Sequence, residues 1–268
     1  MPDLAGLAST LARSITEDIP DGAILEAIPE PNHRCAPARH LELLHRFVHC
    51  NPIYHTFRKS TLSDIPVQMC KGDFNRYWLG SIRHNASKAP FSPTWLLSAY
   101  AAASVIRSMN LLEVVDVGSG DGRIAYSARV CGMKAYSIEI DYDLVSLQKT
   151  ISGATGVCFR SEQADASAFD YDDLGLRRPA FFIGGLAQMG GAKLAESVLD
   201  RIGDVPGLSE RSCMVLVGTY SPKYAPAPPA GWGPTIRDRG LKVLASVDLP
   251  TAWTMGEKRY TPYLYCGV

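Results

Sequence analysis

The sequence predicts an α/β protein built on a Rossmann-like, doubly wound sheet of seven strands, mostly parallel, with an antiparallel last strand. From residue 94 onward, apolar strand-like runs alternate with helical patterns, which implies parallel pairing with helices on both faces of the sheet. The last two apolar runs have only a turn region between them, which predicts a hairpin. A turn with three glycines follows the first strand, at the edge where such sheets bind ligands.

The apolar pattern gives each element an expected range. Strands are expected over 114–117, 135–140, 157–160, 180–183, 213–219, 242–247 and 263–267. Helices are expected over 95–109, 123–131, 142–151 and 193–202. The proline-rich segment 221–234 is too interrupted for either regular structure, so we expect a long loop at the carboxyl edge of the sheet. Aromatic residues next to or within this loop either line a substrate channel or pack the loop onto the sheet: Tyr220, Tyr224 and Trp232.

The pattern changes near residue 90. Residues 4–15 and 41–50 have helical apolar spacing, and prolines interrupt the chain between them. We therefore predict two parts: residues 1–90 as a mainly helical N-terminal extension, serving as a cap or substrate-recognition region, and residues 91–268 as the sheet domain.

Composition points to a globular chain without a strong electrostatic preference. In 268 residues, Lys plus Arg number 27 and Asp plus Glu number 27, so no overall attraction to nucleic acid or an anionic membrane is indicated. The apolar stretch 96–106 is far shorter than the roughly 20 residues that cross a bilayer. Residues 1–19 lack the basic start and apolar core of a signal peptide. We expect a cytoplasmic protein without a membrane span.

The cysteines and histidines do not predict a metal site. Seven cysteines occur without a Cys-x-x-Cys pair, which favours reduced thiols, and Cys158 and Cys213 are expected to be buried in strands. One group could be assembled into a zinc site but lacks the usual paired ligand spacing: Cys35, His40, His45, His49 and Cys50. We predict no metal.

The glycine turn indicates a nucleoside cofactor, and the spacing of its glycines indicates which cofactor. A dinucleotide site uses Gly-x-Gly-x-x-Gly, in which the third glycine permits close packing of helix on strand. Here the glycines are Gly118, Gly120 and Gly122, and Arg123 stands where the dinucleotide pattern needs its third glycine. This spacing disfavours NAD, which stays open as the alternative.

S-adenosylmethionine suits the same residues better, because it carries a cationic sulfonium and an amino-acid tail instead of a pyrophosphate. Asp116 ends the first strand, where it can attract the ammonium of the tail, and Gly118 and Gly120 let the chain turn closely against the ligand. Glu139 ends the next strand and can accept hydrogen bonds from both ribose hydroxyls. Ile140 would then lie against one face of the adenine.

Two further acids follow strands. Asp141 precedes the helix that begins near Tyr142 and is a good N-cap residue. Asp165 and Ala166 follow the third strand, where an acid can accept a hydrogen bond from the adenine amino group; the alternative is that Asp165 is one of several loop acids.

Together these motifs resemble the class I S-adenosylmethionine-dependent methyltransferases over residues 90–268. The glycine motif Asp116–Gly122, the ribose acid Glu139 and the pair Asp165-Ala166 carry the resemblance. It implies that 91–268 is a methyltransferase domain with S-adenosylmethionine as cofactor. The implied cofactor-binding residues are Thr94, Asp116, Gly118, Ser119, Gly120, Gly122, Glu139, Ile140, Asp165 and Ala166.

The segment Pro90-Phe91-Ser92-Pro93-Thr94, ahead of the glycine motif, resembles a narrower group. These are small archaeal and eukaryotic protein-lysine methyltransferases, including enzymes that act on the ATP synthase c subunit. The resemblance implies that Thr94 helps to bind the methionine end of the cofactor and that the acceptor is a protein side chain, with lysine favoured.

The acceptor stays open on the residues themselves. The Asn/Asp-Pro-Pro-Tyr motif of many enzymes that methylate planar nitrogens is absent after the fourth strand, where the chain continues Gly184-Gly185-Leu186, and no catalytic base is identified. An RNA methyltransferase is the first alternative, on the basic cluster Arg76, Arg83, His84 and Lys88. A small-molecule methyltransferase is another, and a cofactor-binding pseudoenzyme or assembly partner is the alternative of a different class.

Overall fold

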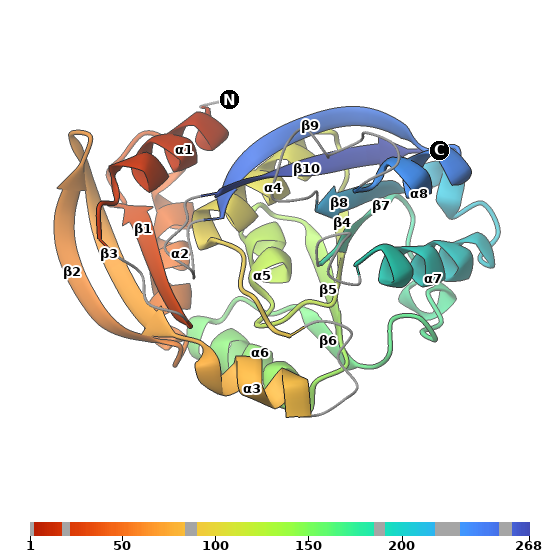
Figure 1. Cartoon of the computed structure of the whole chain (residues 1–268), viewed down its shortest axis with the longest axis horizontal. Coiled ribbons are helices and arrows are strands. Elements are labelled where there is room, and N and C mark those ends of the chain that lie inside the picture. Colours follow the sequence, from red (N-terminus) through yellow and green to blue (C-terminus); the bar gives the residue numbers. More distant parts are fainter. Residues whose placement is uncertain (1–2, 18–21, 84–89, 185–190, 218–230, 252–258) are drawn as a thin grey trace.

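A computed structural model describes residues 3–17, 22–83, 90–184, 191–217, 231–251 and 259–268, and it contains two sheets (Figure 1). The larger sheet has seven strands in the order β6-β5-β4-β7-β8-β10-β9. Strand β10 is antiparallel to both of its neighbours, β8 and β9, whereas the pairs from β6 to β8 are parallel. The predicted α/β class, the seven strands and the antiparallel last strand are confirmed.

The elements of the larger sheet lie close to the ranges predicted from the sequence. The strands are β4 (Glu113–Val117), β5 (Lys134–Glu139), β6 (Arg160–Gln163), β7 (Pro179–Ile183), β8 (Cys213–Val217), β9 (Lys242–Thr251) and β10 (Arg259–Gly267). The helices are α4 (Leu96–Ser108), α5 (Arg123–Val130), α6 (Tyr142–Thr155), α7 (Gly191–Gly203) and α8 (Gly233–Asp238).

One strand is displaced from its prediction. Strand β6 begins at Arg160, whereas the apolar run suggested 157–160. Cys158 therefore precedes the strand and is exposed, so its predicted burial is wrong; Cys213 is buried in β8 as expected. A short apolar run before a strand resembles the strand itself, which is why periodicity alone misplaced this boundary.

Helices cover both faces of the larger sheet, and alternate side chains of each strand point to opposite layers. On one face, Val114 and Phe182 pack with the buried alanines of α4 and α5. On the other, Val115 and Phe181 pack with α7. This alternation is the physical basis of the doubly wound arrangement, because both faces of the sheet are removed from water.

The N-terminal part contains more than the predicted helices. Helices α1 (Leu4–Ser14) and α2 (Ala38–Cys50) lie where helical spacing placed them, and α3 (Asn75–Arg83) is a third. Between them the chain forms an antiparallel sheet in the order β1-β3-β2, which the expectation of helices and loops left out. Its strands are β1 (Ala23–Pro29), β2 (Tyr54–Leu62) and β3 (Ile65–Asp73).

The small sheet tolerates its prolines because they lie at its ends. Pro66 is the second residue of the central strand β3, and pairing with β1 begins only at the next residue, where Val67 faces Pro29. A two-residue turn, Ser63-Asp64, joins β2 to β3 with positive φ at both residues. Such turns usually carry Asn-Gly or Asp-Gly, so Ser63-Asp64 is not a strong hairpin signal.

Helix α4 lies between the two sheets (Figure 1). It is buried around almost its whole circumference, and its small residues, three of them the consecutive alanines 101–103, suit that position. Leu96 and Tyr100 of α4 pack with Ile24 and Phe47 of the N-terminal part in one hydrophobic core. The indole Nε1 of Trp95 donates to the Leu25 carbonyl oxygen at 2.6 Å. The change of pattern near residue 90 is therefore not a break in packing.

The proline-rich segment 221–234 falls largely outside the described residues. Trp232, which is described, is fully buried against the sheet, and its indole nitrogen donates to the Val217 carbonyl oxygen. Of the two interpretations given for Trp232, packing is the one observed. No helix among the described residues has the length and apolar character needed to traverse a bilayer.

Candidate functional site

The glycine turn and the predicted ribose acid meet at the carboxyl edge of the larger sheet. Strands β4 and β5 are parallel and in register, with Val117 facing Ile138. The backbone nitrogens of Gly118 and Ser119 both donate to the Ile138 carbonyl oxygen. The turn 118–122 is thus attached to the end of β5, one residue before Glu139.

All three glycines of the turn have positive φ, at +66° for Gly118, +57° for Gly120 and +77° for Gly122. L-residues with a Cβ adopt this conformation only at a cost of about 1–3 kcal/mol. The turn closes through a hydrogen bond from the Gly122 nitrogen to the Ser119 carbonyl oxygen at 2.8 Å. Helix α5 begins at the following residue, Arg123.

Glu139 is buried directly against this turn. Its Oε2 accepts from the Gly120 nitrogen at 2.8 Å, and its Oε1 accepts from the Asp141 nitrogen at 3.1 Å. Burial raises the pKa of the Glu139 carboxyl, although these backbone donors oppose the shift. Each carboxylate oxygen can accept about two hydrogen bonds, so acceptor capacity remains at Glu139.

Asp116 is the next-to-last residue of β4, near the same edge, and it is also buried. Its Oδ2 accepts from the Ala125 nitrogen at 3.2 Å, in the first turn of α5. Burial raises the pKa of Asp116 well above its usual range, and the neighbouring acids Glu139 and Asp121 add to this. The carboxyl therefore supports the helix start, and its expected contact with an ammonium group stays a prediction.

The other residues predicted to bind the cofactor differ in burial and in their hydrogen-bond partners. Asp141 caps α6 as expected, accepting from the nitrogens of Asp143 and Leu144, and Ile140 beside it is partly exposed. Asp165 is exposed and accepts from the nitrogen and hydroxyl of Ser167, while Ala166 is buried.

Thr94 contacts the first residue of α5 and the strand β10. Its carbonyl oxygen accepts from Arg123, and its side chain forms a hydrogen bond with Tyr263 of β10.

Gln148 of α6 supports the turn from within the sheet domain. This side chain is fully buried, and its Nε2 donates to the Ser119 hydroxyl at 2.9 Å and to the Gly120 carbonyl oxygen at 2.7 Å. Its Oε1 accepts from the Ser137 hydroxyl at 2.5 Å. Sequence reasoning missed Gln148; the available signal was a polar residue on the apolar face of the 142–151 helix.

Arg123 supports the turn from the other side, through Asp121. Its Nε and Nη2 donate to both carboxylate oxygens of Asp121, at 2.8 and 2.5 Å. Its Nη1 donates to Glu26 Oε1 of β1 at 3.0 Å, and Asn51 donates to Asp121 at 3.0 Å. Arg123 therefore faces the N-terminal part. This buried network was not predicted, because its members are far apart in the chain.

The ring of Phe91 covers Gly120. A Cβ added to Gly120 would lie 2.6 Å from the ring, closer than packing allows. Phe91 in turn makes edge contacts with Phe74 and Tyr77, each with ring centroids 6.2 Å apart. Among the residues that the structure describes, Ser92 has a buried hydroxyl without a hydrogen-bond partner. The Phe91 ring thus packs against the turn, and the residue that follows it has a buried hydroxyl without a partner in the described part of the chain.

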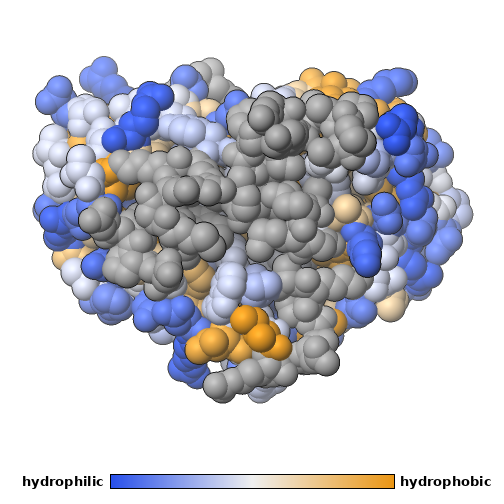
Figure 2. Space-filling model, viewed as in Figure 1, coloured by the Kyte–Doolittle hydropathy of each residue, from blue (hydrophilic) through white to orange (hydrophobic). Residues whose placement is uncertain are grey.

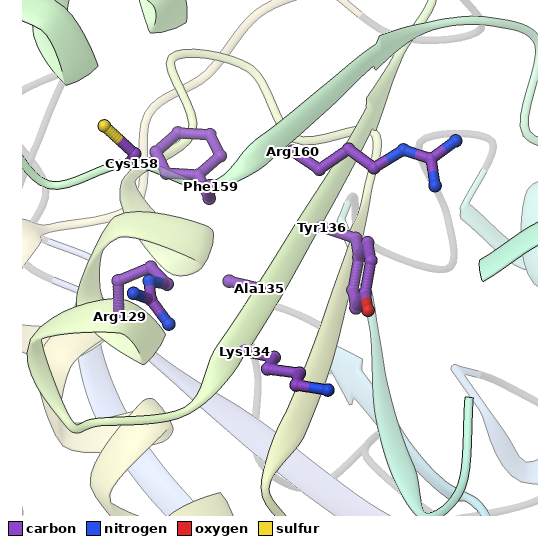
Figure 3. A pocket seen from close by; sticks show the side chains of 7 residues that line it. All are labelled: Arg129, Lys134, Ala135, Tyr136, Cys158, Phe159 and Arg160. Atoms are coloured by element: carbon purple, nitrogen blue, oxygen red, sulfur yellow. The ribbon is translucent and has the colours of Figure 1, made fainter. Parts of the chain in front are cut away.

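A separate cavity of about 240 Å³ lies at the amino ends of β5 and β6, away from the glycine turn. Figure 3 shows Lys134, Tyr136 and Arg160 on one side of β5, with Arg129 and Phe159 on the other. Arg160 is paired with Glu162. Because ligands of open α/β sheets bind at the carboxyl edge, this shallow basic hollow is not the expected cofactor site.

Comparison of the chain with protein-family models gives no match, and comparison with curated proteins gives none. Several solved structures are similar, all with TM-scores below one half. The Pyrococcus abyssi tRNA (uracil-54, C5)-methyltransferase in complex with S-adenosyl-L-homocysteine has 13% identity and a TM-score of 0.47, over 80% of this chain and 44% of that one.

Two more similar structures come from other methyltransferases. The precorrin-6y C5,15-methyltransferase of Geobacter metallireducens has 18% identity and a TM-score of 0.43, over 63% of this chain and 86% of that one. The ribosomal protein L11 methylase of Lactobacillus delbrueckii has 17% identity and a TM-score of 0.41, over 63% and 76%. Similarities this distant do not identify the activity of the chain, and its fold class rests on the strand order.

The contact between Phe91 and Gly120 predicts a large effect of Gly120→Ala on stability. Gly132→Ala is the matched control, because Gly132 has a φ of +80° and open space where a Cβ would be. We expect Gly132→Ala to lower the free energy of unfolding by about 1–2 kcal/mol, and Gly120→Ala to cost about 1–3 kcal/mol more. Urea unfolding of both variants measures this, and equal losses would contradict the packing.

Proposed function

We propose that this chain is an S-adenosylmethionine-dependent methyltransferase. One observation carries the proposal: the positive-φ turn 118–122 at the carboxyl edge of the sheet holds the buried carboxylate of Glu139 by a hydrogen bond from the Gly120 nitrogen. This places an acceptor of hydroxyl hydrogen bonds beside the backbone of Gly118, where an added Cβ would meet only an ordinary van der Waals contact and a ligand can approach closely. A ribose and its attached amino-acid tail need both.

The charges at this edge favour a cationic ligand over a pyrophosphate. Three buried carboxyls lie together, Asp116, Asp121 and Glu139, and the guanidinium of Arg123 is already shared between Asp121 and Glu26. Among the described residues, Arg123 is the cation paired with these carboxyls, so an anion would be repelled as they ionise, whereas a sulfonium or ammonium would be attracted.

The backbone amides of the turn also disfavour NAD. A pyrophosphate is normally bound by free N–H groups at a helix N-terminus. Here the nitrogens of Gly118 and Ser119 donate to Ile138, that of Gly120 donates to Glu139, and that of Gly122 donates to the Ser119 carbonyl oxygen. Few donors of the turn remain for phosphate oxygens.

The chain's residues fit the proposed cofactor in distinct roles. Glu139 would accept from the ribose hydroxyls, Ile140 would contact the adenine, and the predicted pair Asp165-Ala166 would lie near its amino group. Asp116 and Thr94 would face the amino-acid tail. When bound, the cofactor supplies an electrophilic methyl group, and the protein's task is to align the acceptor with it and to exclude water.

We further propose a protein side chain as acceptor, with lysine favoured. The motif resemblance over residues 90–94 supports this, and so does an apolar surface on the N-terminal part. Leu79 and Ile82 of α3 are 50% and 54% exposed, and Figure 2 shows an apolar patch where Figure 1 places α3. Exposed apolar patches commonly mark protein-binding surfaces. Tyr77 of the same helix contacts Phe91, which covers the turn.

Binding calorimetry tests the cofactor. We expect S-adenosylmethionine and its demethylated product to bind, and NAD to bind far more weakly. Preferential binding of NAD would overturn the proposal.

Transfer of a labelled methyl group into a lysate of the source organism tests the acceptor. Label in the protein fraction supports the proposed class, and amino-acid analysis then tests lysine. Label confined to RNA or to small molecules would identify those acceptors instead. Tight cofactor binding with no label in any fraction would identify a pseudoenzyme or assembly partner.

Glu139→Ala is expected to weaken cofactor binding by about 1–3 kcal/mol, the usual scale for losing hydrogen bonds to a charged group. Glu139→Gln is the matched control, because it keeps the side-chain volume and one acceptor oxygen, and its loss should be smaller. Calorimetry gives the affinities, and circular dichroism checks folding. Unchanged affinity in a folded Glu139→Ala variant would show that another acid contacts the ribose.

Cofactor affinity is expected to strengthen as the pH rises above about 4, the range in which exposed carboxyls titrate, by at most about tenfold per pH unit for each proton released. Burial raises the pKa values of Asp116 and Glu139, so both carboxyls keep their protons to higher pH than exposed acids do. A neutral carboxyl attracts a cation less, and binding must therefore release protons at low pH. Calorimetry in buffers of different ionisation enthalpy counts them; affinity independent of pH would contradict this.

A further inference from the structure

We infer that Arg123 is a positioning residue, which fixes the glycine turn through Asp121 and makes the N-terminal part of the chain a determinant of cofactor affinity. As far as the ligand is concerned, this inference rests on the proposed function. Its geometric content, the ordering of the turn by Arg123, can be tested without any ligand.

Asp121 lies between Gly120 and Gly122 in the turn, and its side chain is held from the N-terminal part of the chain. Gly120 and Gly122 have no side chain through which the protein could hold them, and glycine has the largest conformational freedom of any residue. Asp121 is 1% exposed and receives three hydrogen bonds, two from Arg123 and one from Asn51. Fixing this carboxylate therefore fixes the backbone on either side of it.

The remaining partners of Arg123 come from outside the turn. Glu26 of β1 accepts from Arg123, from the hydroxyl of Tyr54 at 2.8 Å and from the Leu96 nitrogen at 2.9 Å. The guanidinium also lies over the ring of Phe47, with its carbon 5.7 Å from the centroid. The small sheet, α2 and the start of α4 thus determine together where Arg123 lies.

The charges of Asp121 and Glu26 favour an arginine at position 123. Burial disfavours a charged guanidinium, but Asp121 and Glu26 more than offset this, so the pKa of Arg123 is raised. Its five N–H donors lie in one plane and can serve two carboxylates and a carbonyl oxygen at once, which an ammonium group cannot do with the same geometry. Lysine at this position would keep the charge but lose the fork that orients Asp121.

The fold supplies a control for a merely structural role. Tyr126, three residues along α5, is fully buried, and its hydroxyl donates to the Leu43 carbonyl oxygen of α2 at 2.7 Å. Its side chain joins the same two parts of the chain, and its one bond to the turn, from the backbone nitrogen to the Gly122 carbonyl oxygen, is kept when the hydroxyl is removed. Tyr126→Phe should therefore weaken the junction while leaving the turn ordered.

The experiment compares Arg123→Lys, Glu26→Gln and Tyr126→Phe with the unchanged protein. Amide hydrogen exchange and the NMR shifts of Gly120 and Gly122 report on the turn, and calorimetry measures the affinity for S-adenosylmethionine. For Arg123→Lys we expect about tenfold or faster exchange of both glycine amides and about tenfold or weaker binding, the scale of losing hydrogen bonds to a charged group. Glu26→Gln should show the same changes to a smaller degree, and Tyr126→Phe should show neither.

The outcomes separate the two proposals. Faster exchange at the turn in Arg123→Lys, with no S-adenosylmethionine binding even by the unchanged protein, would support the positioning role and overturn the proposed function. Normal exchange and normal affinity in a folded Arg123→Lys variant would overturn the positioning role. Equal losses in Tyr126→Phe would also overturn it, because they would arise from the junction as a whole. If Arg123→Lys does not fold, Glu26→Gln decides by the same two measurements.

Discussion

The arrangement of the chain depends on the two buried ion pairs that the guanidinium of Arg123 forms. The guanidinium lies between Asp121, in the glycine turn, and Glu26, in the small N-terminal sheet. Buried ion pairs are weak evidence for stability, since desolvation offsets much of the attraction, but separating the partners strands a charge in the interior. The N-terminal part and the glycine turn are therefore held in one relative position, and alternatives that separate them are disfavoured.

The ion pairs of Arg123 explain why the two parts of the chain pack together, although the sequence pattern changes near residue 90. The N-terminal part supplies Ile24 and Phe47 to a core that also contains Leu96 and Tyr126. Its own sheet has only three strands, and such a small sheet needs another layer for stability. Helices α4, α5 and α6 supply that layer, with the larger sheet on their other side (Figure 1). The shape of the carboxyl edge is consequently set by both parts of the chain.

Sequence reasoning succeeded where one local pattern determines the structure. Alternating apolar runs identified the seven strands, and the parallel register of β4 and β5 then had to bring Gly118 and Glu139 to one edge. It failed for the N-terminal sheet, because β2 has an irregular pattern of exposed residues and its turn is Ser63-Asp64. It also could not identify Gln148 or Arg123 as supports of the turn, because their partners are fixed only by tertiary packing.

Gln148 and Arg123 order a turn that its glycines would otherwise leave flexible. A turn that a ligand approaches closely needs residues without side chains, and those residues are the ones that lose most conformational entropy on ordering. Gln148 holds the carbonyl of Gly120 from within the sheet domain, and Arg123 holds Asp121 from the N-terminal side. A turn already ordered on both sides loses less entropy when a ligand binds, so more of the contact energy remains as affinity. The side chains that sequence patterns cannot identify are thus those that make the recognisable glycine motif effective.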